Sequence, residues 1–146
     1  MSDCCAKKSS IISAHECPEC HQYCKNISLK TIYHHVKFSE NQAILAGDYY
    51  FCANKSCAVA YFLATGSLFP KRLLISAQAI EEDRLCYCFD ISEAEYRAAL
   101  EDGSAEMIKN FVIAQTKMAL CACEVRNPSG QCCLATFKRL EKDARR

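Results

Sequence analysis

The chain has 146 residues and a formal net charge of +1, from 18 basic and 17 acidic side chains. This length suits one domain or two small modules, and the balanced charge argues against a polybasic surface for nucleic acid or anionic lipid. No apolar run approaches the roughly 20 residues of a membrane span, and the opening MSDCCAKKSS lacks the apolar stretch of a signal peptide. We therefore expect a cytoplasmic protein without membrane insertion or nucleic-acid binding.

Cysteine is the residue type that says most about this chain, because there are 13 of them. In a secreted protein this density would indicate disulfides, but an odd count in a reducing compartment favours metal binding. Seven cysteines lie in the first 57 residues and six in the last 61, and the segment between them holds Pro70 and a charged run at 81–84. The sequence therefore predicts two modules, residues 1–80 and residues 81–146.

The first module is expected to contain one short helix and a hairpin. SLKTIYHHV, from Ser28, fits a helix capped by that serine. The residues expected on its apolar face are Leu29, Ile32, Tyr33 and Val36, with His34 and His35 at its surface and edge. DYYFC and AVAYFLA are rich in aromatic and β-branched residues and flank the polar ANKSC, which predicts two strands around a tight turn.

The second module is expected to be helical. Ser92 and Glu95 have the spacing of a capping box, so a helix should begin there and end near Gly103. A second helix is predicted at about 104–118, with Ile108, Phe111, Val112 and Gln115 on its packed face. A third is predicted at about 132–142, with Leu134, Phe137 and Leu140 together. The fold class is thus α+β.

Two cysteine pairs of the first module have the spacing of zinc knuckles. CPEC places Cys17 and Cys20 two residues apart, and CANKSC places Cys52 and Cys57 further along the chain. Structural zinc prefers four thiolates in a tetrahedron, which two tight turns can supply, and backbone N–H groups in such turns disperse the negative charge of the sulfurs. These four cysteines are the predicted Zn²⁺ ligands.

Other interpretations of the first group remain open. One CxxC pair could be a redox dithiol, although the βαβ context typical of such a pair is not visible. Cys24, His15 and His21 could each replace a ligand, but surface residues beside a metal site are the simpler interpretation. Cys4 and Cys5 are expected to be spare thiols near the terminus.

The second group of cysteines does not have knuckle spacing. Cys86 and Cys88 are separated by one residue, and a distant loop adds further thiols; these are Cys121, Cys123, Cys132 and Cys133. Two such loops can bind the two irons of a [2Fe–2S] cluster. Both are predicted to run into helix N-termini, whose N–H groups favour an anionic cluster. A second zinc site is the alternative.

Six thiols are available where a cluster needs four. Cys132 and Cys133 are adjacent, so their side chains diverge and only one of them is expected to bind. Cys121 and Cys123 pose the same choice less sharply, because both can face one way in an extended segment. The preferred set is Cys86, Cys88, Cys123 and Cys133, with Cys121 and Cys132 as substitutes.

The order of these motifs resembles a known family. CPEC, then YYFCANKSCAVAYF, CYCF and CEVRNPSGQCC resemble the N-terminal domain of CopZ-type copper chaperones, from about Cys17 to Phe137. The resemblance implies a mononuclear zinc module followed by a [2Fe–2S] module related to bacterioferritin-associated ferredoxin. It implies zinc ligands at Cys17, Cys20, Cys52 and Cys57, and cluster ligands at Cys86, Cys88, Cys123 and one of the adjacent pair. The Met-x-Cys-x-x-Cys copper motif of full-length chaperones does not occur in this sequence.

The sequence therefore predicts a small zinc knuckle and β-hairpin module followed by a small helical [2Fe–2S] module. The expected function is electron transfer, assisting copper handling by metal reduction or chaperoning, with a redox partner, a copper-handling protein or copper ions as partners. An enzyme is less expected, because neither a His-Glu-x-x-His motif nor a glycine-rich phosphate loop is present. The alternative is a non-catalytic, metal-stabilised interaction module that docks a metal-handling or regulatory partner.

Overall fold

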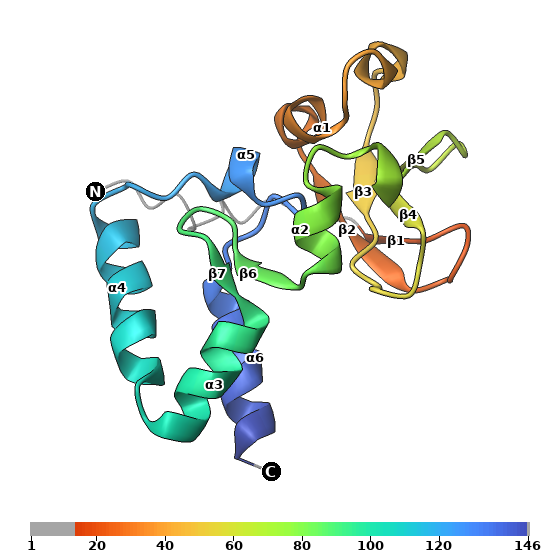
Figure 1. Ribbon diagram of the computed structural model, residues 1–146. Coiled ribbons are helices and arrows are strands. Elements are labelled where there is room, and N and C mark those ends of the chain that lie inside the picture. The colour runs from red at the N-terminus through yellow and green to blue at the C-terminus, as the bar shows by residue number, and fades with distance from the viewer. Residues whose placement is uncertain (1–13, 146) are drawn as a thin grey trace.

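The computed structural model describes residues 14–145, so Cys4 and Cys5 lie outside the described residues. In chain order, an antiparallel sheet with a helix beside it comes first, and a group of helices follows (Figure 1). We call residues 14–76 the sheet half and residues 84–145 the helical half; helix α2, Ala77–Glu81, connects them. The predicted α+β class is confirmed.

Five strands pair antiparallel in chain order to form the main sheet. They are β1 (Ala14–Glu16), β2 (Tyr23–Ile27), β3 (Tyr49–Phe51), β4 (Val59–Leu63) and β5 (Leu68–Pro70). Because β2 pairs antiparallel with both β1 and β3, those two strands run in the same direction. Their C-terminal ends therefore meet at the same end of the sheet, where the segments carrying the first four candidate cysteines begin.

The two faces of the sheet carry two separate hydrophobic clusters. Successive strand residues point to opposite faces, so Tyr49 packs in one cluster and Tyr50 in the other. The Tyr49 cluster includes Ile32 and Val36 from a helix, whereas the Tyr50 cluster contains cysteines. Strand β4 is buried along its whole length because it contributes to both clusters, which explains its uninterrupted apolar sequence.

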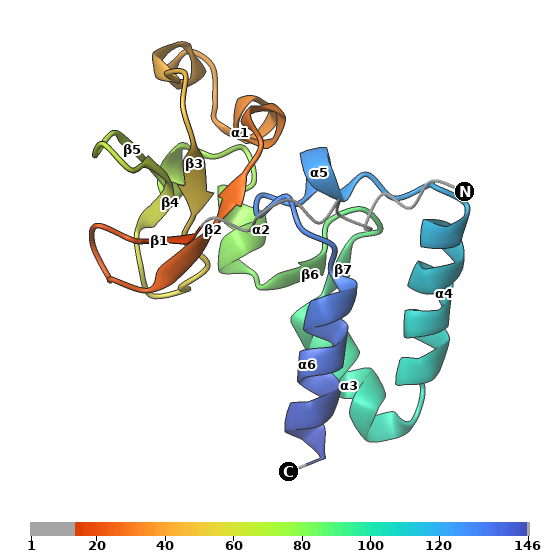
Figure 2. The same ribbon diagram turned by 180° about the vertical axis from the view of Figure 1, so that it is seen from behind.

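Helix α1, Leu29–His35, begins as predicted, with the Ser28 side chain accepting a hydrogen bond from the Thr31 backbone N–H. Its buried face differs from the prediction. Leu29 and Tyr33 are partly exposed, while Thr31 and His35 are buried. The placement of His35 at a helix edge was therefore wrong. The face is rotated because α1 also packs against α5 of the helical half (Figures 1 and 2).

Two short 3₁₀ helices complete the sheet half. Helix η1 spans Glu40–Ala43 and η2 spans Lys71–Leu73. Leu74, directly after η2, is fully buried in the cluster that contains Tyr49. The chain then enters α2, so the sheet half is closed by an apolar contact just before the connection to the helical half.

The helical half contains a two-stranded ribbon and four helices within residues 84–145. These are β6 (Arg84–Cys86), β7 (Ile91–Ser92), α3 (Glu93–Asp102), α4 (Ala105–Lys117), α5 (Cys123–Arg126) and α6 (Leu134–Ala144). The predicted capping box is present, since Ser92 and Glu95 exchange hydrogen bonds of 3.1 and 2.9 Å. Gly103 ends α3 in the left-handed conformation, as predicted.

The core of the helical half lies between α3, α4 and α6. The Tyr96 and Phe137 rings meet edge to face at 4.6 Å between centroids, and Leu140 is fully buried beside them. The packed face of α4 differs from the prediction: Val112 is buried, but Phe111 is half exposed. None of the helices in the described part of the chain is long and apolar enough to cross a membrane.

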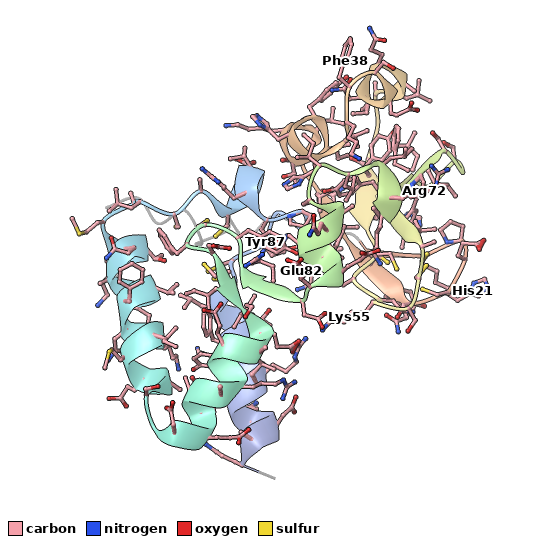
Figure 3. All side chains as sticks on the ribbon, in the orientation of Figure 1. His21, Phe38, Lys55, Arg72, Glu82 and Tyr87 are labelled. Carbon is pink, nitrogen blue, oxygen red and sulfur yellow. The ribbon has the colours of Figure 1, made fainter. Side chains whose placement is uncertain are left out.

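The two halves are joined by polar contacts as well as by α2. The Lys55 ammonium group, between β3 and β4, lies 2.8 Å from Asp83 and 2.9 Å from Glu93. Figure 3 shows Lys55 at the boundary between the halves. Lys55 is more than half exposed, so solvent screening limits the stability that these ion pairs add. The buried contacts of α1 with α5 are therefore the firmer connection.

His35, buried where α1 meets α5, should make stability depend on pH. Burial lowers the pKa of His35 to about 4, while the backbone of Val125 partly offsets this effect. Below about pH 6.5, His35 of the unfolded chain therefore binds a proton, whereas His35 of the folded chain stays neutral until the pH approaches about 4. Stability is therefore full above that pH and is lost as the pH falls, by about 2 kcal/mol at pH 5.

Urea denaturation of the parent and of His35→Gln between pH 7.5 and pH 5 checks this expectation. The difference between the two unfolding free energies isolates His35 from the other groups that titrate in this range. We expect the parent to lose stability more steeply than the variant; parallel profiles would contradict the account.

Candidate metal centres

Four thiols of the sheet half converge at one end of the sheet. The sulfurs of Cys17, Cys20, Cys52 and Cys57 all lie within 4.8 Å of one another. Cys17 to Cys57 is 3.8 Å and Cys20 to Cys52 is 3.5 Å, so each contact joins one turn to the other. All but Cys20 are buried. Sequence positions up to 40 residues apart are thus brought into the space of one metal ion.

The first turn holds its thiols through its own backbone. The Cys17 N–H donates to the Gln22 carbonyl at 2.9 Å, and the Cys17 carbonyl accepts from the His21 N–H at 2.9 Å. His21 adopts a φ of 64°, the left-handed conformation that lets the chain reverse within the turn. Backbone hydrogen bonds therefore hold the CPEC turn in its conformation.

The second turn is held from outside as well as from within. The Asn54 side-chain oxygen accepts from the Ser56 N–H at 3.0 Å, and the Asn54 carbonyl accepts from the Cys57 N–H at 3.0 Å. Lys71 Nζ donates to the carbonyls of Asn54 and Cys57 at 2.6 and 2.7 Å. Sequence reasoning missed this lysine because it lies 14 residues beyond Cys57. Its ammonium group brings positive charge close to the thiols.

Local hydrogen bonds and burial act on these thiols in opposite directions. The side chain of Asn54 and the backbone of Gln22 lower the pKa of Cys20 to about 6. Burial raises the pKa of Cys52 and of Cys57. The site therefore offers the Cys20 thiolate readily and holds Cys52 and Cys57 as thiols until a cation compensates their charge.

The alternative ligands lie outside the group of four. Cys24 is buried, but its thiol donates to the Gln22 carbonyl at 3.3 Å, and burial raises its pKa. The His15 ring packs against the Tyr50 ring in a tilted arrangement, 4.7 Å between centroids. The exposed His21 ring lies 3.6 Å from the Glu16 carboxylate. Within residues 14–145, the compact donor set therefore consists of the four predicted cysteines.

A second group of thiols gathers where the β6–β7 ribbon meets the α5–α6 connection. Cys88 Sγ lies 3.7 Å from Cys123 Sγ and accepts from the Ala122 N–H at 3.1 Å. Cys86, at the end of β6, neighbours Cys133, the N-cap residue of α6, whose thiol lowers the pKa of Cys86. The preferred set of the sequence analysis is thus brought together from two distant segments.

The contacts bear on the two choices that the sequence left open. Cys133 is buried and neighbours both Cys86 and Cys123, whereas Cys132 is half-buried and neighbours Cys123. Cys123 is the thiol found 3.7 Å from Cys88, and Cys121 is buried two residues earlier. Cys123 and Cys133 thus lie next to the thiols of the C-x-C pair.

The thiols of the second group also have pKa values shifted in opposite directions. The thiol of Cys123 and the backbone N–H of Ala122 lower the pKa of Cys88 to about 6. The neighbouring thiol of Cys133 lowers the pKa of Cys86, and the pKa of Cys133 itself is raised by the same crowding of thiols. The C-x-C pair is therefore the side of the group that ionises first. Sequence reasoning missed the short helix α5, which presents the Ala122 N–H to Cys88.

A family model described as a zinc binding domain, that of CopZ, matches residues 14–74. The copper chaperone CopZ of Archaeoglobus fulgidus is 32% identical over 129 residues, which cover 85% of this chain; the chain spans about 60% of that relative's length. The X-ray structure of the Archaeoglobus fulgidus CopZ N-terminal domain matches with a TM-score of 0.67 at 32% identity, over 86% of this chain and 96% of that one. The chain therefore belongs to the family of the CopZ N-terminal domain, and residues 14–74 form its zinc-binding domain.

Proposed function

We propose that this protein carries two different inorganic centres and transfers single electrons in support of copper handling. Zn²⁺ would be held by Cys17, Cys20, Cys52 and Cys57, and a [2Fe–2S] cluster by Cys86, Cys88, Cys123 and Cys133. The observation that carries the proposal is the convergence of two separate thiol groups, each assembled from two distant turns. The corresponding modules are residues 1–80 and residues 81–146.

The first group has the donor chemistry of a structural zinc site. Four sulfurs in one small volume match the closed tetrathiolate sites in which zinc is stable and redox-inert. Hydrogen bonds from Asn54 and Gln22 to Cys20 provide the outer contacts that orient a ligand and disperse its charge. The role of this zinc is to stabilise the sheet half, because metal binding and folding are coupled in small domains.

The second group has the donor chemistry of an iron–sulfur site. A [2Fe–2S] cluster takes four cysteine thiolates over two irons, so its ligands spread more widely than those around one ion. The Ala122 N–H aimed at Cys88 Sγ is a donor of the kind that tunes such clusters. Cys133 begins α6, so the unsatisfied N–H groups of that helix face the same region.

When bound, a [2Fe–2S] cluster supplies one-electron redox chemistry, and the chain's own residues hold it near the surface. Cys88 is half-buried, so an electron has a short path to a docked redox partner. One electron converts Cu(II) to Cu(I), the form that thiolates prefer. A relative is named a copper chaperone, which supports copper ions or a copper-handling protein as the recipient.

A second candidate function is a non-catalytic interaction module in which both metals are structural. The observation that favours it is an exposed apolar row on α4 and just beyond it, formed by Met107, Phe111, Met118 and Leu120. Redox titration of the bound cluster separates the two candidates. Reversible one-electron reduction supports electron transfer, and a cluster that stays oxidised over accessible potentials supports the interaction module.

Replacing one thiol of the first group should release zinc, while replacing its buried neighbour should not. Cys52→Ser removes a proposed ligand, so we expect zinc affinity to fall by at least about 100-fold and thermal stability to fall with it. Cys24→Ser is the matched control, because Cys24 is equally buried but lies outside the group of four. Metal analysis and thermal unfolding check this; equal zinc loss in both variants would contradict the assignment.

The adjacent cysteines before α6 provide a second matched pair. Cys133→Ser should abolish visible cluster absorption and acid-labile sulfide, because it removes a proposed ligand that lies beside Cys86. Cys132→Ser should keep most of both signals, and both variants should keep their zinc. The reverse result would assign the ligand to Cys132, and joint loss of zinc and iron would argue against two separate centres.

A further inference from the structure

The segment that carries two of the proposed cluster ligands is held by the sheet half. We call residues 123–133 the ligand segment; it contains α5 and the turn that leads to α6. Helix α1 packs against α5, and Figures 1 and 2 show the two helices side by side from opposite directions. The side-chain hydrogen bonds at this contact run from the sheet half to backbone carbonyls of the ligand segment.

Thr31 makes the first of these bonds. Its hydroxyl donates to the carbonyl of Glu124, the residue directly after Cys123, at 2.6 Å, and the threonine is fully buried. The orientation of Thr31 is set within its own helix, since the Ser28 hydroxyl lies 3.1 Å from its Oγ1 and accepts its backbone N–H. A side chain fixed at the start of α1 thus fixes a peptide group beside a cluster ligand.

Tyr61 makes the second bond. Its hydroxyl donates to the Pro128 carbonyl at 2.5 Å, and Tyr61, which lies on β4, is fully buried. Pro128 has no backbone N–H, so its carbonyl is the polar backbone group through which this residue can be held. The Tyr61 ring packs on Phe51, 5.6 Å between centroids, and Phe51 directly precedes Cys52. A continuous path of packed side chains therefore runs from the zinc turn to the ligand segment.

Gly130 shows how closely the segment approaches Thr31. A Cβ at this position would lie 3.0 Å from Thr31 Oγ1, and the glycine has a φ of +69°. Both the close approach and the left-handed backbone favour glycine here. The contact therefore leaves little room for displacement toward α1.

We propose that Thr31 and Tyr61 are positioning residues for the cluster: by holding the carbonyls of Glu124 and Pro128, they keep Cys123 and Cys133 opposite the C-x-C pair. The inference rests on the proposed function, because it assumes a cluster in the second group of thiols. It assigns the zinc-binding domain a task beyond its own stability, namely bracing the redox site. Cluster retention then depends on two hydroxyl groups that lie outside the ligand set.

The size of the effect follows from the cost of an unsatisfied buried carbonyl. Removing the Tyr61 hydroxyl leaves the buried Pro128 carbonyl without that donor, and removing the Thr31 hydroxyl does the same to the partly buried Glu124 carbonyl. Such losses correspond to roughly a tenfold change in an equilibrium or rate. We expect Thr31→Val and Tyr61→Phe each to lose the cluster to an iron chelator about tenfold faster than the parent. Zinc content should stay unchanged, because neither side chain is a zinc ligand.

The chain offers a matched control for each variant. Thr116→Val removes the hydroxyl of another buried threonine, whose oxygen has no hydrogen-bond partner within the described residues. Tyr49→Phe removes the hydroxyl of another fully buried tyrosine in the same sheet, which accepts from the Leu45 N–H at 3.2 Å and does not reach the ligand segment. Both controls should lose the cluster within about twofold of the parent rate, because they keep the carbonyl contacts.

Three measurements on the full chain, purified anaerobically, decide the matter: zinc and iron content, the rate at which chelator bleaches the visible absorption, and the electron paramagnetic resonance spectrum of the reduced cluster. The two test variants should bleach faster, show shifted resonance values and keep zinc. A parent that contains zinc but no iron would overturn the proposed function and this inference with it. A normal parent with test variants that behave like their controls, or that lose zinc together with iron, would overturn the inference alone.

Discussion

The structure depends on the convergence of the CPEC and CANKSC turns at one end of the sheet. That convergence follows from pairing: β2 pairs antiparallel with both β1 and β3, so the turns after those two strands emerge side by side. Four thiols within 4.8 Å of one another would repel if all were ionised, so a divalent cation is the natural compensation. A zinc-binding domain is what the family match assigns to these residues.

The sheet half supports the helical half through its polar side chains. The helical core, built around Tyr96 and Phe137, includes Cys86 and Cys133. Two carbonyls of the ligand segment, those of Glu124 and Pro128, accept hydrogen bonds from Thr31 and Tyr61, which belong to the zinc-binding domain. Under the proposed function, these contacts give the zinc-binding domain a second role, because its sheet offers a surface against which the ligand segment is fixed.

The sequence predicted the features that follow from local pattern. The cap at Ser28, the capping box at Ser92 and Glu95, strands β3 and β4 and the spacing within each knuckle cysteine pair all have short-range signals. It did not predict the buried face of α1, because Thr31 and His35 are polar and become buried only against a segment 90 residues away. Lys71 and the Ala122 N–H were missed for a similar reason, since their partners are set by the fold and not by spacing.

The central claim is that the two thiol groups hold unlike metals. Elemental analysis of the anaerobically purified parent, combined with acid-labile sulfide determination and Mössbauer spectroscopy, tests it most directly. The account predicts about two iron atoms and two sulfide ions for each zinc ion, with the iron present as a [2Fe–2S] species. Zinc in both groups, with neither iron nor sulfide, would contradict it.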